Sequence, residues 1–139
     1  MSATFIVDCS IAMTWLFNDE ATPKTAALLG RLASETALVP AWWLIEVTNV
    51  IALAERKRRI TPHQSAAFIN DIGKLDIEID GEGPARAFAQ ILPLCRTHQL
   101  TSYDANYLDL AVRRELPLAT LDQELRKAGR KLGVDLLGL

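Results

Sequence analysis

Residues 100–125, LTSYDANYLDLAVRRELPLATLDQEL, contain two predicted helix starts on either side of a short apolar segment. We expect helices over 104–115 and 122–131, each opened by an aspartate, Asp104 or Asp122, that can cap the helix N-terminus. The segment PLATL between them is a predicted strand. A helix, a strand and a helix in succession are typical of an α/β protein.

The same alternation runs through the rest of the chain. The predicted strands are the segments TFIVD, ALVP, DIEID, PLATL and VDLL. The other predicted helices cover residues 10–19, with Ser10 as cap, 23–34, 41–58, 62–75 and 84–98, the last kinked at Pro93. Most strands are continuous apolar runs, which favours a parallel sheet covered by helices on both faces.

The composition is that of one domain. The chain has 139 residues, of which 50% are hydrophobic, and no repeat or linker divides it, so we expect a single domain over residues 1–139. No apolar run is long enough to span a bilayer and no signal segment precedes the first strand, so we expect a soluble, cytoplasmic protein without a membrane segment. Cys9 and Cys95 lack metal-binding spacing and are predicted to be reduced thiols.

The total charge does not attract nucleic acid. Fifteen Lys and Arg against seventeen Asp and Glu give a formal net charge of −2. Basic groups occur at predicted helix ends, in residues 56–59, 113–114 and 126–131. We interpret each as a solvated helix end that complements the helix dipole, with a local patch for nucleic acid as the alternative.

Four acidic residues are predicted to meet at one edge of the sheet. Asp8 ends the first strand, Glu46 lies in the first turns of the helix after ALVP, and Asp104 and Asp122 open their helices. In an open parallel sheet, ligands bind outside the carboxyl ends of the strands, where these positions fall. Helix capping alone would account for Asp104 or Asp122 if either is considered singly. An acidic cluster is the better interpretation only when all four residues are considered together.

Glu46 is the most unusual of the four. It stands in AWWLIEVTNVIALA, which is apolar almost all round and therefore predicted to be largely buried, where a lone carboxylate needs a partner. Asn49, three residues further on, shares its helix face. Ser10 and Thr120, each two residues from an aspartate of the set, can add hydroxyls to the same place, or act only as a cap and a strand residue.

The cluster predicts a metal ion and hydrolytic chemistry. Crowded carboxylates repel one another unless a cation neutralises them. Oxygen ligands favour Mg²⁺ or Mn²⁺ over Zn²⁺, and His63 and His98 are predicted surface residues rather than ligands. Such a site suits attack of metal-activated water on a phosphodiester.

Three segments together resemble the PIN-domain ribonucleases, in particular VapC-like toxins of toxin–antitoxin pairs: FIVDCSIAMTWLF, WWLIEVTNVI and residues 100–125. The resemblance implies a three-layer α/β/α sandwich with a central parallel sheet of about five strands. It also implies an Mg²⁺- or Mn²⁺-dependent endoribonuclease that cleaves single-stranded regions of RNA such as tRNA or rRNA. By motif, the catalytic and metal-binding positions are Asp8, Glu46, Asp104 and Asp122, with Asp8 and Asp104 as direct ligands, and the adjoining polar positions are Ser10, Asn49 and Thr120.

The resemblance also implies partners. A small VapB-like antitoxin is expected to block the active-site groove, and a homodimer, or a larger complex with the antitoxin, is expected for the toxin. We interpret Trp15, Phe17, Trp42 and Trp43 as core residues, with the lining of an antitoxin groove as the alternative.

Other α/β domains also place acids and Mg²⁺ at their strand ends. A phosphoacceptor receiver domain would want a second acid after Asp8, where Cys9 stands, and an aspartyl phosphatase would want an aspartate in place of Ser10. Both are disfavoured. A non-catalytic PIN-like binding module and a metal-dependent DNA nuclease stay as alternatives.

Overall fold

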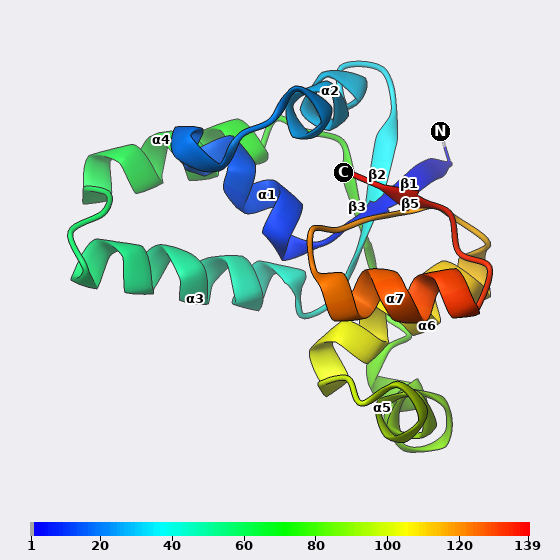
Figure 1. Ribbon diagram of the computed structural model, residues 1–139. Coiled ribbons are helices and arrows are strands. Elements are labelled where there is room, and N and C mark those ends of the chain that lie inside the picture. The colour runs from blue at the N-terminus through cyan, green and yellow to red at the C-terminus, as the bar shows by residue number, and fades with distance from the viewer. Residues whose placement is uncertain (1) are drawn as a thin grey trace.

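A five-stranded sheet forms the centre of the molecule (Figure 1). The computed structural model describes residues 2–139. The strands, in the spatial order β3-β2-β1-β4-β5, are β1 Ala3–Val7, β2 Thr36–Pro40, β3 Ile77–Asp80, β4 Leu118–Ala119 and β5 Leu136–Leu137. Every neighbouring pair is parallel, which confirms the predicted α/β class and the five-stranded parallel sheet.

The central strands are apolar because they are enclosed on both faces. Phe5, Ile6 and Val7 of β1 have no exposed surface, and neither do Leu38 of β2 and Leu118 of β4 that pair with Ile6. The strand order runs outward from β1 in one direction through β2 and β3, and in the other through β4 and β5. The carboxyl ends of β1 and β4 therefore form the topological switch point, where open parallel sheets bind ligands.

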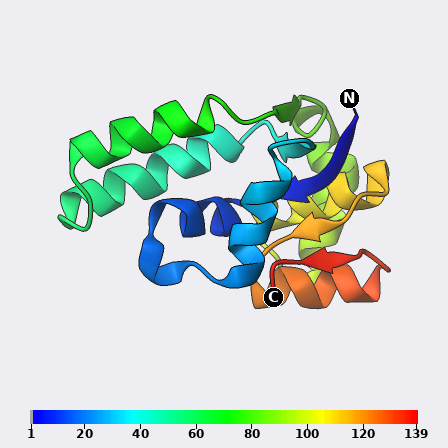
Figure 2. The same cartoon turned by 90° about the horizontal axis from the view of Figure 1, so that it is seen from above.

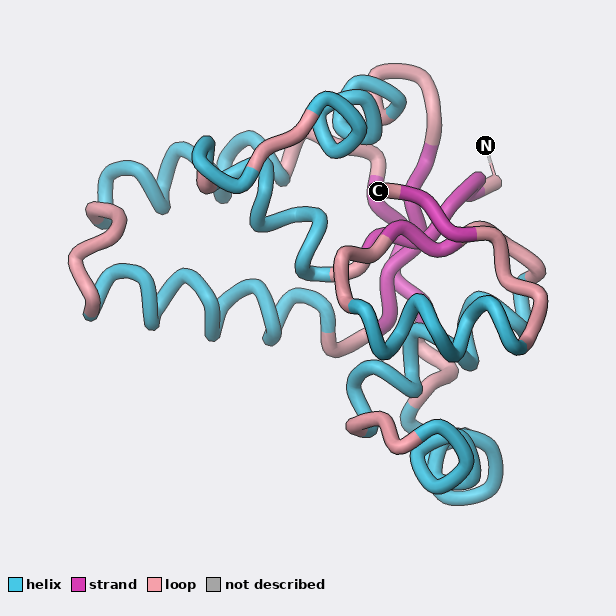
Figure 3. Tube along the Cα trace, in the orientation of Figure 1, coloured by secondary structure: helices cyan, strands magenta, loops and turns pink. Residues whose placement is uncertain are grey.

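Helices cover both sides of this sheet. The α-helices are α1 Cys9–Leu16, α2 Pro23–Arg31, α3 Trp43–Arg56, α4 Pro62–Ile72, α5 Leu92–His98, α6 Ser102–Arg114 and α7 Gln123–Lys131. α1 and α2 lie on one side, and α5, α6 and α7 on the other (Figure 1). α3 and α4 run side by side and project beyond the sheet (Figure 2). Outside the strands the chain is mostly helical (Figure 3), and none of the helices in residues 2–139 combines the length and apolar character needed to cross a bilayer.

Two predicted helix caps are wrong by a few residues. Asp8, not Ser10, caps α1, because its side chain accepts a hydrogen bond from the Ser10 N–H. Thr101 caps α6, so that Asp104 is the third residue of the helix and not its cap. Asp122 caps α7 as predicted. Helix capping therefore does not explain why an aspartate stands at position 104.

The prediction that the helix carrying Glu46 is largely buried is wrong. Leu44, Ile45 and Leu53 of α3 are exposed, by 47%, 61% and 38%. They are exposed because the α3–α4 pair extends past the sheet, so that only one side of α3 packs on the protein. α3 also begins later and ends earlier than predicted. α4 begins as predicted but ends earlier, at Ile72.

The tryptophans next to this helix divide between core and surface. Trp43 and Phe17 are buried and Trp15 is half-buried, as predicted for core residues. Trp42 is 47% exposed, so its interpretation as core is wrong. Trp42 directly precedes the first turn of α3, which begins with the buried Trp43.

The predicted helix over residues 84–98 is broken into three pieces. A 3₁₀ turn at Pro84–Arg86 and a π-helical turn at Ala87–Ile91 precede α5. Pro93 has no N–H and its ring crowds the preceding turn, so the helix widens before it, and the Leu92 N–H bonds to the Ala87 carbonyl five residues back. The irregularity is thus longer than a single kink.

Ion pairs join α6 to the end of β3. Arg113 donates to both oxygens of Asp80, the last residue of β3, at 2.9 and 3.0 Å, and to Glu82 at 2.6 Å. Hydrogen bonds from Arg113 hold the pKa of Asp80 below its usual range. Arg113 is only 14% exposed, so the interpretation of residues 113–114 as a solvated helix end is wrong for this arginine.

Arg126 is a second arginine whose predicted surface position is wrong. It is buried, and its Nη1 donates to the carbonyl oxygens of Thr120 at 2.7 Å and Leu137 at 2.9 Å. These bonds connect the end of β4 to the end of β5. Arg126 lies in the first turn of α7 and faces the sheet, whereas Lys127, Arg130 and Lys131 are exposed.

We expect Arg113→Met to lower the free energy of unfolding by about 3 kcal/mol, because it leaves the buried Asp80 carboxylate without its main partner. Arg114→Met is the matched control: Arg114 is exposed, its contacts are near 4 Å, and its loss should cost less than about 1 kcal/mol. Urea denaturation of both variants measures the difference. Equal effects of the two substitutions would contradict the assignment.

Candidate active site at the carboxyl edge of the sheet

Asp8 is the most enclosed of the four predicted acids. It follows β1 directly and is 5% exposed. Its Oδ2 accepts hydrogen bonds from Thr120 Oγ1 at 2.6 Å and Ser10 Oγ at 2.9 Å. Burial raises the pKa of Asp8, and these hydrogen bonds oppose the rise by favouring the charged form. One carboxylate thus connects the end of β1, the start of α1 and the end of β4.

Thr120 brings Asp122 to the same place. Its hydroxyl donates to Asp8 and accepts a hydrogen bond from the Asp122 N–H at 3.0 Å. The Asp122 carboxylate accepts from the Leu125 N–H at 2.8 Å, and its charge raises the pKa of both Asp8 and Asp104. Asp122 therefore caps its helix and also belongs to the cluster.

Glu46 has the partner that its position requires, and the partner is Tyr107. The Tyr107 hydroxyl donates to Glu46 Oε1 at 2.9 Å, and its oxygen accepts from the Cys9 N–H at 3.3 Å. A hydroxyl has one hydrogen, so the Cys9 contact leaves that hydrogen for Glu46. Burial raises the pKa of Glu46 to about 7, the Tyr107 hydrogen bond opposes the rise, and the charges of Asp8 and Asp104 add to it.

Asp104 completes the group from α6. It is half-buried, and burial together with the charges of Asp122 and Asp8 raises its pKa to about 6. Asp8, Asp104 and Asp122 thus each raise the pKa of at least one other acid of the set, and Glu46 is raised by two of them. The structure brings together all four residues that the sequence places at strand ends and helix starts.

The donor set fits a hard cation, although the side chains are not closed around one. No three His, Cys, Asp or Glu side chains in residues 2–139 converge into a group that could hold an ion as they stand. All four acids offer carboxylate oxygens, which are the ligands that hard cations such as Mg²⁺ prefer. Cys9 adds no thiolate, because burial and the charges of Glu46 and Asp8 raise its pKa to about 12. It and Cys95 are free thiols, as predicted.

The polar residues predicted beside the acids fall into two groups. Ser10 and Thr120 contact Asp8 directly. Asn49 is exposed and lines a cavity of about 460 Å³ together with Glu46 and Cys9, as expected from its shared helix face. Tyr107 was missed, although a tyrosine three residues after Asp104 on an apolar helix face is a signal that it shares the site.

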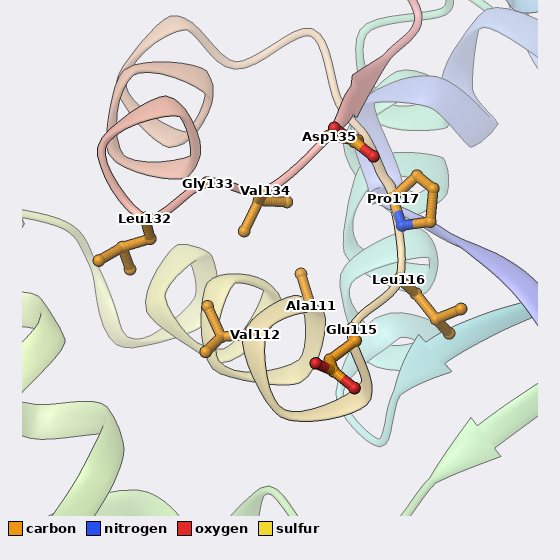
Figure 4. Close-up of a pocket in the computed structure, with 9 residues that line it drawn as sticks. All are labelled: Ala111, Val112, Glu115, Leu116, Pro117, Leu132, Gly133, Val134 and Asp135. Carbon is orange, nitrogen blue, oxygen red and sulfur yellow. The ribbon is translucent and has the colours of Figure 1, made fainter.

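Another cavity, of about 350 Å³, lies at the opposite edge of the sheet (Figure 4). Its walls include Pro117 and Asp135, which precede β4 and β5, and Glu115 at the end of α6. None of the predicted site residues lines it. The four predicted acids therefore lie at the carboxyl edge and do not contribute to this second cavity.

Comparison with known proteins identifies one family and several solved structures with a similar fold. The family model described as PIN domain matches residues 5–131. Solved structures cover nearly the whole chain: PAE2754 from Pyrobaculum aerophilum has a TM-score of 0.66, 19% identity and coverage of 98% of this chain and 92% of that one. VapBC2 from Rickettsia felis, bound to a DNA fragment from their promoter, has a TM-score of 0.67, 11% identity and 96% coverage of both chains.

A third structure, FitAcB from Neisseria gonorrhoeae, has a TM-score of 0.66, 17% identity and 97% coverage of both chains. At these identities the three similarities show the fold. A comparison with curated proteins finds no significant match.

In the absence of divalent cations, we expect the free energy of unfolding to fall as the pH rises from about 4.5 to about 7. The folded protein holds protons on Glu46 and Asp104 in this range that the unfolded chain has released, so stability is lost on passing through the raised pKa values. Groups with lowered pKa, such as Glu35 at about 2, act only below this window. Urea denaturation with a chelator measures the slope.

Glu46→Gln should flatten the upper half of this pH window, and the exposed Glu124→Gln is its control. A slope that is unchanged by Glu46→Gln would show that the Glu46 carboxylate does not carry the effect.

We expect Tyr107→Phe to move the pKa of Glu46 above about 7, because it removes the hydrogen bond that favours the charged form. A carboxyl carbon titration by NMR, with the Glu46 signal assigned from Glu46→Gln, measures the shift. Tyr103→Phe removes an exposed hydroxyl on the same helix and should leave the titration as it is. A downward shift in Tyr107→Phe would contradict the direction of the hydrogen bond.

Proposed function

Since the chain belongs to the PIN-domain family, we propose that it is an Mg²⁺- or Mn²⁺-dependent endoribonuclease and the toxin of a toxin–antitoxin pair. PIN domains are generally nucleases. The observation that supports the proposal is that Asp8, Glu46, Asp104 and Asp122 lie at the carboxyl edge of the sheet, close enough for their charges to raise one another's pKa values. Four carboxylates at a strand edge are costly to a fold unless a cation joins them.

Each residue has a proposed role that follows from its contacts. Asp8 and Asp104 are the direct metal ligands, and Glu46 and Asp122 complete the acidic set. A bound Mg²⁺ would supply activation of water and stabilisation of the leaving oxygen. Thr120 and Ser10 hold Asp8 in one rotamer, because each donates its hydroxyl hydrogen to Asp8 Oδ2.

Glu46 suits a proton-accepting role toward the attacking water. Its carboxylate lines the cavity of about 460 Å³ and is held by Tyr107, so it is positioned to accept a proton from a water in that cavity. Tyr107 fixes Oε1, which leaves Oε2 for the cleft.

We propose single-stranded regions of RNA, such as those of tRNA or rRNA, as the substrate. The net charge of −2 requires local phosphate contacts, and Arg56, Lys57 and Arg58 are exposed at the end of α3, about 15 Å along the helix from Glu46. Arg113 and Arg126 are excluded from this role because their guanidinium groups bind protein acceptors.

A VapB-like antitoxin is the proposed partner. An apolar groove of about 330 Å³ lies between α3 and α4, with Leu44 and Ile69 exposed beside Val47 and Phe68. A groove of this kind fits the apolar face of a partner helix. The similarity to VapBC2 supports this assignment. A single PIN domain over residues 1–139, a homodimer or a larger complex with the antitoxin, and a cytoplasmic location belong to the same proposal.

We expect Asp8→Asn and Asp104→Asn each to lower Mg²⁺-dependent RNA cleavage by at least about 100-fold, because each removes a proposed metal-binding charge. Cell growth on induced expression, and new 5′ ends in total RNA, measure the activity. Removal of divalent cations from the purified wild type by a chelator should abolish cleavage in the same way.

Asp135→Asn is the matched control, since it makes the same substitution at the opposite edge of the sheet. Cleavage that survives Asp8→Asn in a folded protein would refute the assigned site. Intact RNA together with cleaved single-stranded DNA would favour the DNA nuclease. If neither RNA nor DNA is cleaved, the non-catalytic binding module is favoured.

A further inference from the structure

Two exposed aromatic side chains stand beside the carboxylates. Trp42 is four residues before Glu46 and is 47% exposed, and Tyr103 directly precedes Asp104 and is 56% exposed. Neither ring has a role in the core or in the proposed hydrolysis. Large aromatic surface next to a polar site is a common mark of a binding surface.

These two rings line a pair of adjoining cavities. The cavity of about 460 Å³ that contains Glu46 and Asn49 is lined by both, and so is a cavity of about 350 Å³ that reaches Gly83 and Asn106. We call the second one the aromatic cavity; it is lined by Trp42, Tyr103, Gly83, Pro84, Ala87 and Asn106, among others. A ligand in the aromatic cavity would therefore lie next to the carboxylates, with the two rings between them.

Asn106 gives the aromatic cavity a polar wall that lacks a partner. Its side chain is 4% exposed, and its Oδ1 makes no hydrogen bond within residues 2–139. Buried polar atoms are almost always paired, so this one calls for a ligand or a water. The amide fits closely against Gly83, where a Cβ atom would come within 2.8 Å of Oδ1. Glycine at that position leaves the amide room to stay at the cavity wall.

We propose that the aromatic cavity binds a nucleobase of the single-stranded substrate, stacked on Trp42 and Tyr103 and hydrogen-bonded by Asn106, beside the phosphate that reaches the carboxylates. This rests on the proposed nuclease function. Stacking on exposed aromatic rings is the usual way in which proteins hold unpaired bases. A carboxamide offers one donor and one acceptor group, which is what a base edge needs.

The alternative occupants fit less well. An anionic group would find no basic side chain among the residues that line the aromatic cavity, whereas a base is neutral. An apolar side chain of a partner polypeptide would cover the rings but leave the Asn106 Oδ1 without a hydrogen bond, which is unfavourable for a buried polar atom. The nucleobase satisfies both the rings and the amide.

The test is binding of single-stranded RNA hexamers rA6, rU6 and rC6 to the Asp8→Asn protein, which should not cleave them. Fluorescence anisotropy at one fixed salt concentration gives Kd. Trp42→Ala and Tyr103→Ala, each made in the Asp8→Asn protein, should raise Kd about 5- to 150-fold, the usual effect of losing one stacked base. Tyr103→Phe, which keeps the ring, should bind as the parent does.

Phe88→Ala is the matched control, because Phe88 is 88% exposed and lines neither cavity. Thermal melting of every variant shows that it is folded. Asn106→Ala should change the order of preference among the three hexamers, since the amide contacts the base edge.

Hexamers that lack one base at a time separate stacking from backbone contacts. At one position the abasic hexamer should bind more weakly than the intact one to the parent, and the difference should vanish in Trp42→Ala. If the alanine variants and the abasic hexamers bind like their parents while the wild type still cleaves RNA, the nucleobase site is refuted and the rings are left as a polypeptide contact. Absence of RNA cleavage by the folded wild type refutes the proposed function instead, and absence of any hexamer binding by the folded parent refutes the nucleobase site.

Discussion

The buried carboxylate of Asp8 is the constraint on which the arrangement of the site depends. A charge with 5% exposure is stable only if hydrogen bonds satisfy it, and here the donors come from Ser10 on α1 and Thr120 at the end of β4. The same bonds fix how the two strands at the switch point end relative to each other. Thr120 then holds the Asp122 N–H, so a second acid is placed by the contacts of the first.

The site is arranged against the stability of the fold. Asp8, Glu46 and Asp104 all have raised pKa values because burial and mutual repulsion disfavour their charged forms. Hydrogen bonds from Thr120, Ser10 and Tyr107 reduce that cost without removing it. Local energetic cost that persists in a well-packed protein is characteristic of functional sites, where a ligand relieves it.

The remainder of the molecule divides its charged and apolar groups between structure and binding. Arg113 and Arg126 are held by protein acceptors and tie the outer strands to the helices. The basic end of α3 stays exposed, as do apolar side chains on the projecting α3–α4 pair. The groove between α3 and α4 and the aromatic cavity have no lining residue in common.

Local patterns in the sequence predict the alternation of strands and helices, the parallel sheet, the Asp122 cap and the four acids at one edge, because apolar periodicity and helix starts are local properties of the chain. Long-range packing is needed to see that Tyr107 holds Glu46, 61 residues away, that Thr120 holds Asp8, 112 residues away, and that Trp42 is exposed while Trp43 is buried. The same packing makes Arg113 a largely buried partner of Asp80 and leaves the neighbouring Arg114 exposed. Adjacent residues with the same local pattern differ in these respects because each faces a different distant element, and the direction in which a side chain meets that element is set by the packing of the whole sheet.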